Sequence, residues 1–261
     1  MSELDLEIIG PALIAGLLVL STHCLLGREV VKRGIIFMDL AIAQIAGLGV
    51  IMAGFFHLGE FPILLQLFAC SFALLGALLL AWSEIKLKQF QEPLIGVFFV
   101  LSASASILLL SHDPQAGEHL KDLLAGQILW VTYPQLWAFA AISLLVLIGW
   151  FFIPNKKLSF YCLFAISVTA SVQIVGIYLV FSSLIIPALA SISLGNKKAF
   201  IGSLLIGALG YASGLWLSLV WDLPSSALIV WCMAFWAAIF YLSLSKIAVT
   251  EKTCPRNDSA V

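Results

Sequence analysis

Charged residues are scarce in this chain: they make up 10% of its 261 residues, while 62% are hydrophobic and the mean hydropathy is +1.10. Soluble globular domains carry roughly 25% charged and 45–50% apolar residues. The composition therefore excludes a soluble domain and predicts an integral membrane protein. The formal net charge is -1, so no excess of basic residues is available to bind nucleic acid.

Motifs for common chemistries are also missing. The chain has no GxxxxGK[ST] sequence for a P-loop, and no HExxH or GxSxG sequence for an intramembrane protease, so we expect no enzyme activity. The five cysteines form no CxxC pair and no disulfide framework. The acidic start MSELDLEIIG lacks the basic region of a cleavable signal peptide, and we expect none.

Long apolar runs are plentiful and predict an all-α polytopic bundle of about 8–9 transmembrane segments. We expect one domain over residues 1–261, with a short cytoplasmic tail from about 246. The interval 158–195 allows two short spans or a hairpin that does not fully cross. The other helices are expected at 8–26, 36–56, 62–82, 94–111, 135–153, 199–220 and 226–245.

The basic residues predict the orientation. If the N-terminus lies outside, every Lys and Arg except Lys121 falls on the cytoplasmic side, as the positive-inside rule requires. Most acidic residues and three of the four histidines then lie outside. This outer face suits a protein that handles cations, although acids outside also simply complement bases inside.

Two ionisable residues stand inside apolar segments. Asp39 is the only carboxylate placed well inside one, so it is either functional or an interfacial ion pair with Arg33 or Lys32. Gln44 follows five residues later, about 140° away around a helix, and does not share its face. His23, near the inner end of the first helix, is either a hydrogen-bonded packing residue or part of a polar path.

The loop SHDPQAGEHLKDLL, residues 111–124, is the densest polar cluster. Asp113 and Pro114 predict a helix start, and the spacings of Glu118, His119 and Asp122 place their side chains on one side of that helix. With His112, these groups suit zinc or manganese. The alternative is an ordinary solvated helix at the membrane surface.

The stretch QIVGIYLVFSSLIIPALAS, residues 173–191, combines apolar residues with polar and helix-breaking ones. If it is one unbroken helix, Gln173, Gly176, Val180, Ser183 and Pro187 share a narrow face. That face would pack closely or line a path, with Pro187 breaking the helix. A turn near Gly176 would remove this face.

Several of these stretches, in order, resemble the membrane permease subunits of bacterial zinc/manganese ABC importers. They are VVKRGIIF, LIGVFFVLSASASILLLS, LLAGQILWVTYPQL, QIVGIYLVFSSLIIPALA and WDLPSSALIV, and together they span nearly the whole chain. The resemblance implies a type II ABC importer-like fold in the bacterial inner membrane, with the C-terminus in the cytoplasm. It implies a homodimer, embedded in lipid, with a separate ABC ATPase subunit that binds ATP and a periplasmic metal-binding protein. Zn²⁺ or Mn²⁺ would be the transported substrate, and no cofactor would be bound covalently.

The chain departs from this family at two places. The family's second helix carries G-D-x-x-x-H-A; here one register pairs Asp39 with Ala43, and the other pairs Leu40 with Gln44. The usual D-P-E-F-A segment that docks the ATPase is replaced by the short loop IPNKKLSFY, residues 153–161, so WSEIKLKQFQEP, residues 82–93, is another candidate contact. These departures keep two alternatives open: a permease of the same fold for another substrate such as a chelated metal, and a non-transporting scaffold or regulatory subunit.

Overall fold

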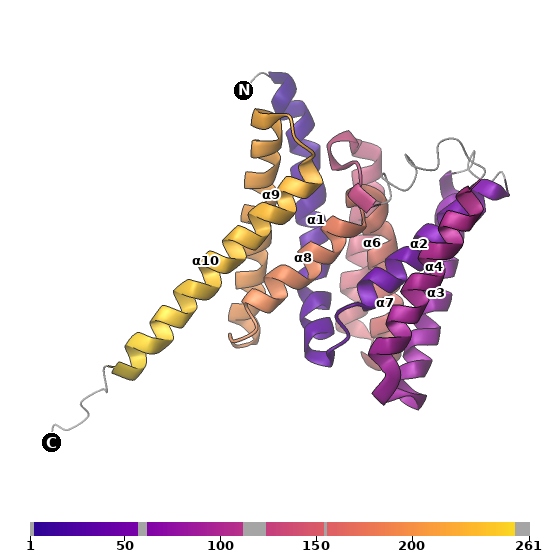
Figure 1. Cartoon of the computed structure of the whole chain (residues 1–261). Coiled ribbons are helices and arrows are strands. Elements are labelled where there is room, and N and C mark those ends of the chain that lie inside the picture. Colours follow the sequence, from indigo (N-terminus) through magenta and orange to yellow (C-terminus); the bar gives the residue numbers. More distant parts are fainter. Residues whose placement is uncertain (1–2, 57–61, 112–123, 154–155, 254–261) are drawn as a thin grey trace.

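The computed structural model describes residues 3–56, 62–111, 124–153 and 156–253, and this part of the chain is helical apart from short connections (Figure 1). The predicted all-α bundle is confirmed. The connections contain two 3-10 helices, η2 (Lys88–Phe90) and η3 (Ile128–Trp130). The α-helices of the described residues are α1 (Glu3–Arg33), α2 (Met38–Phe55), α3 (Pro62–Lys86), α4 (Gln91–Leu110), α6 (Tyr133–Phe152), α7 (Lys156–Val175), α8 (Ile177–Ala190), α9 (Asn196–Trp221) and α10 (Ser225–Thr253).

Eight of these helices are long and apolar enough to cross a membrane; α8 is the exception among the described helices. It has 14 residues, which at 1.5 Å per residue gives about 21 Å, less than the roughly 30 Å of a hydrocarbon core. The prediction of 8–9 segments is therefore met by eight candidate spans and one shorter helix.

The helices differ in how much of their surface the protein covers. Buried positions make up 67% of the membrane window of α7 but only 17% of that of α10. In Figure 1, α1 and α8 lie between the pair α9 and α10 on one side and the group α2, α3 and α4 on the other. The core is therefore built around α1, α7 and α8, and large apolar side chains on the outer helices face outward.

The interval 158–195 forms two helices that meet at Gly176. This glycine has φ 81°, a left-handed conformation that costs other residues roughly 1–2 kcal/mol, and it caps the start of α8. Its backbone lies directly against the backbone of Ala125 and Gly126, and Gly126 also has a positive φ, 70°. Two glycines in contact therefore let the connection after residue 124 cross the break between α7 and α8.

Both ends of this helical pair lie at the same end of the bundle. The guanidinium of Arg33, the last residue of α1, lies over the ring of Phe160 near the start of α7. Arg28, also near the end of α1, donates to the Asn196 side-chain oxygen at the start of α9, at 2.9 Å. This arrangement agrees with both structures expected for residues 158–195, two short spans or a hairpin that does not fully cross.

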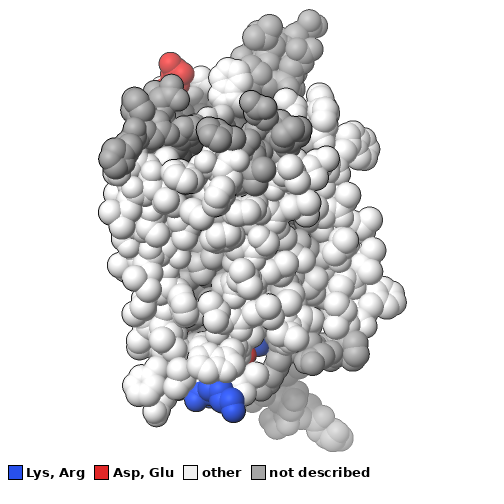
Figure 2. Space-filling model, turned by 90° about the vertical axis from the view of Figure 1, so that its right-hand side faces the viewer, with Lys and Arg blue, Asp and Glu red and all other residues white. Residues whose placement is uncertain are grey.

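We call this end of the bundle the basic end. In the view of Figure 2, Lys and Arg side chains gather there, and the broad middle of the molecule shows none. The described basic residues that define it are Arg28, Lys32, Arg33, Lys86, Lys88, Lys197 and Lys198.

Candidate functional site

Asp39 lies in the first turn of α2 and is 1% exposed. Neither carboxylate oxygen has a hydrogen-bond partner among the described residues. The alternative of an ion pair with Arg33 is wrong, because Arg33 binds other acids, and Lys32 is exposed. Buried carboxylates normally have a partner, since burial without one costs free energy. Asp39 is therefore a structurally unexplained acid inside the bundle.

The rest of α2 supplies no second charged group beside Asp39. Ala43, one turn later, is buried, and Gln44 is half-buried. No group of three or more His, Cys, Asp or Glu side chains within the described residues is placed to hold a metal ion. Asp39 is thus not part of a preformed multidentate metal centre in this part of the chain.

His23 is a second buried polar residue, on α1. Its Nδ1 lies 2.7 Å from the Val19 carbonyl oxygen, which can only accept, so Nδ1 carries the proton. Its Nε2 is buried and finds no partner among the described residues. Next to it, the Thr22 hydroxyl accepts a hydrogen bond from Ser167 of α7 at 3.1 Å. The α1–α7 contact therefore contains hydroxyls and one unused imidazole nitrogen.

The predicted single face from Gln173 to Pro187 is wrong. The chain turns at Gly176, so Gln173 is exposed near the end of α7, whereas Ser183 and Pro187 are buried in α8. The predicted break at Pro187 is also wrong, because α8 continues to Ala190. The Pro187 carbonyl is nevertheless used: it accepts from the hydroxyls of Ser191 at 2.8 Å and Ser203 at 3.1 Å.

Tyr211 of α9 was not singled out from the sequence. It is fully buried, and its ring packs against Gly16 of α1. Its hydroxyl has no hydrogen-bond partner among the described residues. The signal that could have found it is its position between Gly207, Gly210 and Gly214, which pack closely against α1 and α10.

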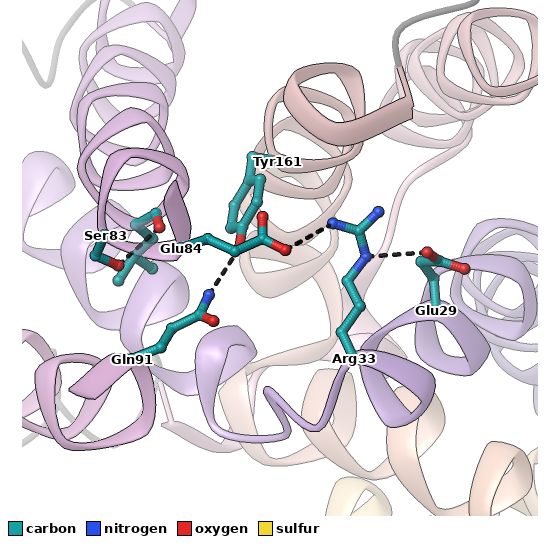
Figure 3. Close-up of polar contacts among 7 residues, drawn as sticks. Glu29, Arg33, Ser83, Glu84, Gln91 and Tyr161 are labelled. Carbon is teal, nitrogen blue, oxygen red and sulfur yellow. Dashed lines mark hydrogen bonds and ion pairs between the residues drawn. The ribbon is translucent and has the colours of Figure 1, made fainter. Parts of the chain in front are cut away.

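A set of polar contacts joins four helices at the basic end, and we call it the Arg33 network (Figure 3). The Arg33 guanidinium bonds Glu29 at 2.9 Å and lies 3.6 Å from the Glu84 carboxylate of α3. Its carbon Cζ lies 4.4 Å from the ring centre of Phe160. The Gln91 side chain of α4 donates to the Tyr161 hydroxyl at 2.8 Å. The network therefore fixes α1, α3, α4 and α7 to one another.

The remaining predicted ligands, His112, Glu118, His119 and Asp122, lie outside the described residues, as does the helix start expected at Asp113 and Pro114.

Comparison with known proteins identifies the class. The profile of the ABC 3 transport family matches residues 5–159 and 154–245, and the chain belongs to this family. A High-affinity zinc uptake system membrane protein ZnuB of Buchnera aphidicola subsp. Schizaphis graminum is 28% identical over 91% of this chain and 97% of that protein. A Manganese transport system membrane protein MntC of Halalkalibacterium halodurans is 25% identical over 84% of this chain and 81% of that protein.

A solved structure shows the same fold. PsaBC from Streptococcus pneumoniae, in complex with a Fab, matches with a TM-score of 0.69 and 24% identity over 90% of this chain and 91% of the matched chain. The predicted type II ABC importer-like bundle is confirmed by such matches. The chain is thus a multi-pass membrane protein of a transport family whose members are transmembrane permeases.

Proposed function

We propose that this chain is the permease subunit of an ABC importer for a divalent transition metal, with Zn²⁺ as the first candidate and Mn²⁺ as the second. It would work as a homodimer, with a separate ATPase subunit and an extracytoplasmic metal-binding protein. The single observation that carries this proposal is Asp39, a carboxylate that is buried at the start of a membrane helix and has no hydrogen-bond partner among the described residues. The names of the two relatives, one for zinc and one for manganese, support the metal class.

The chemistry of Asp39 fits a transient contact with a cation. A carboxylate oxygen binds both zinc and manganese, and an acid without a partner lowers the cost of a dication in a low-dielectric bundle. Because no group of three or more His, Cys, Asp or Glu side chains within the described residues is placed to hold a metal ion, Asp39 would hold the ion only weakly, and the ion could leave again. We propose His23, Gln44, Ser183 and Pro187 as further path residues, and Gln173 from the exposed end of α7.

The orientation follows from the charges. We propose that the basic end faces the cytoplasm, with the N-terminus outside and the C-terminus inside the inner membrane. The polar loop with His112, Glu118, His119 and Asp122 would then face the metal-binding protein and accept the ion. Residues 1–261 would form a single permease domain. The proposed tail from about 246 begins inside α10, which continues to Thr253.

One observation favours a second candidate for the transported substrate. Ala43 is buried where the family's metal path would carry its histidine, so a chelated metal, which brings its own ligands, is the alternative substrate.

Uptake of radioactive zinc by cells that express the chain with its native partners tests the proposal. We expect energy-dependent uptake that excess manganese lowers and excess magnesium does not, and a loss of at least tenfold in Asp39→Ala. Wild-type uptake that depends on an added chelator would favour the chelated-metal alternative. Absence of uptake of any transition metal would reject the proposal.

A further inference from the structure

The turn between α3 and α4, residues Lys86–Phe90, projects from the basic end. It is structured: the Leu87 N–H donates to the Ser83 carbonyl, and the Phe90 N–H donates to the Leu87 carbonyl, both at 2.8 Å. All five of its side chains are exposed. An open hollow of about 560 Å³ is lined by Lys86, Leu87, Lys88 and Gln89. The turn therefore offers a shaped surface with two lysines and two apolar side chains.

The charge of this surface is not balanced locally. The nearest acid in sequence, Glu84, lies against Arg33, and Glu92 forms no ion pair with a described lysine. Within the described residues, Lys86 and Lys88 have no ion-pair partner, and Lys32 at the end of α1 adds a third exposed cation. An acidic partner surface with an apolar contact would complement the turn.

Both ends of the turn are anchored in the bundle. Glu84, two residues before it, meets Arg33 of α1, and Gln91, directly after it, bonds Tyr161 of α7 (Figure 3). A force on the turn therefore reaches α1 and α7 through polar contacts at both of its ends.

The connection that usually docks the ATPase in this family has no room for a docking helix here. Helix α6 ends at Phe152 and α7 begins at Lys156, so only residues 153–155 lie between them. This is fewer than one helical turn. The α8–α9 turn is also basic and is held to α1 by the contact of Arg28 with Asn196, but no side-chain hydrogen bond among the described residues ties it to α7.

We propose that the α3–α4 turn is the principal docking surface for the ATPase subunit, which presents an acidic rim around an apolar contact. This inference rests on the proposed function, because it requires an ATP-hydrolysing partner at the basic end. Lys86 and Lys88 steer and orient the partner, Leu87 and Phe90 make the apolar contact, and the Arg33 network transmits movement to α1 and α7.

Site-specific photo-crosslinking in native membranes tests this assignment. A benzophenone amino acid replaces Lys88, with Ile153 and Ser193 as matched positions in two other connections at the basic end, α6–α7 and α8–α9. Bound ATPase is marked by photolabelling with azido-ATP. We expect a nucleotide-labelled crosslink from position 88 that is at least fivefold stronger than those from 153 and 193.

The other possible crosslinking results contradict either the docking assignment or the proposed function. A labelled crosslink from 153 or 193 with none from 88, or only lipid adducts at 88, overturns the docking assignment and leaves the proposed function intact. Absence of nucleotide-labelled protein from all three positions contradicts the proposed function itself.

Charge reversal gives an independent readout. Lys86→Glu with Lys88→Glu should lower metal uptake at least fivefold without lowering the melting temperature, whereas Lys197→Glu with Lys198→Glu should change uptake less than twofold. Equal losses in both pairs, or a loss confined to the second pair, would overturn the docking assignment.

Discussion

At the scale of single residues, Asp39 shows a conflict between stability and function. An acid that is 1% exposed and has no partner among the described residues destabilises the fold that contains it. The sequence identified Asp39, because it is the only carboxylate well inside an apolar segment. It could not decide whether Arg33 neutralises Asp39, since that depends on Glu84, which is distant in sequence and takes the guanidinium instead.

Asp39→Asn should abolish metal uptake while leaving the melting temperature in detergent unchanged or higher. Asparagine keeps the size of the side chain but cannot ionise, and a buried polar group without a partner costs on the order of 1–3 kcal/mol, more when it is charged. Asp222→Asn is the matched control, because Asp222 is exposed and adopts a left-handed conformation that asparagine also tolerates. The control should change neither quantity. A clear fall in the melting temperature of Asp39→Asn would mean that Asp39 has a structural role.

The Arg33–Glu84 contact should be energetically coupled. Both side chains are mostly buried, with exposures of 16% and 18%, so solvent screens their attraction less than at an open surface. A double-mutant cycle with Arg33→Met and Glu84→Gln, measured by unfolding in detergent, should give a coupling of about 0.5–3 kcal/mol. Additive effects within 0.3 kcal/mol would show that the contact does not join α1 to α3.

At the scale of helices, the sequence predicted most elements because the apolar runs are long and their limits are marked by charge or proline. The ends were less predictable. Helix α1 continues to Arg33, where basic side chains favour a helix C-terminus, whereas the apolar run suggested an end at 26. The prediction of one polar face over 173–187 failed because a single glycine conformation, φ 81° at Gly176, rotates α8 away from α7.

Three glycine-to-alanine variants separate the cost of a positive backbone φ from the cost of a steric clash with neighbouring atoms. Gly176→Ala adds a methyl group at positive φ against the backbone of Ala125 and Gly126, so it should lower the melting temperature most. Gly34→Ala has φ 71° but open space, and it should cost about 1–2 kcal/mol. Gly96 lies inside α4 with neither a positive φ nor a close neighbour, so Gly96→Ala should be neutral or stabilising. Equal melting temperatures for Gly176→Ala and Gly34→Ala would contradict the close contact described here.

At the scale of the whole molecule, the order of apolar segments in the sequence predicted both the fold and the family. Both predictions depend on many weak signals spread over the chain. The Arg33 network was not predictable in this way. Gln91 and Tyr161 lie 70 residues apart, and no local pattern marks them as partners. The missing histidine of α2 was visible in the sequence, but only the packed bundle shows that the Asp39 carboxylate is buried with no hydrogen-bond partner among the described residues.

The proposed orientation predicts which positions reagents can reach. In a variant without the native cysteines, Lys88→Cys and Lys198→Cys should react with a membrane-impermeant maleimide only after the cells are lysed. Asp222→Cys, which is exposed at the end of α9, should react in cells whose outer membrane has been permeabilised. The reverse pattern would place the basic end outside and reject the orientation.

The proposal of metal import is tested by the metal content of whole cells under chelator stress, measured by elemental mass spectrometry. A deletion strain, the same strain with the wild-type gene, and the same strain with the Asp39→Ala gene are compared. We predict a selective fall in zinc, or in manganese, that the wild-type gene restores and the Asp39→Ala gene does not. An unchanged metal profile in the deletion strain would contradict metal import and direct attention to a different substrate or a non-transporting role.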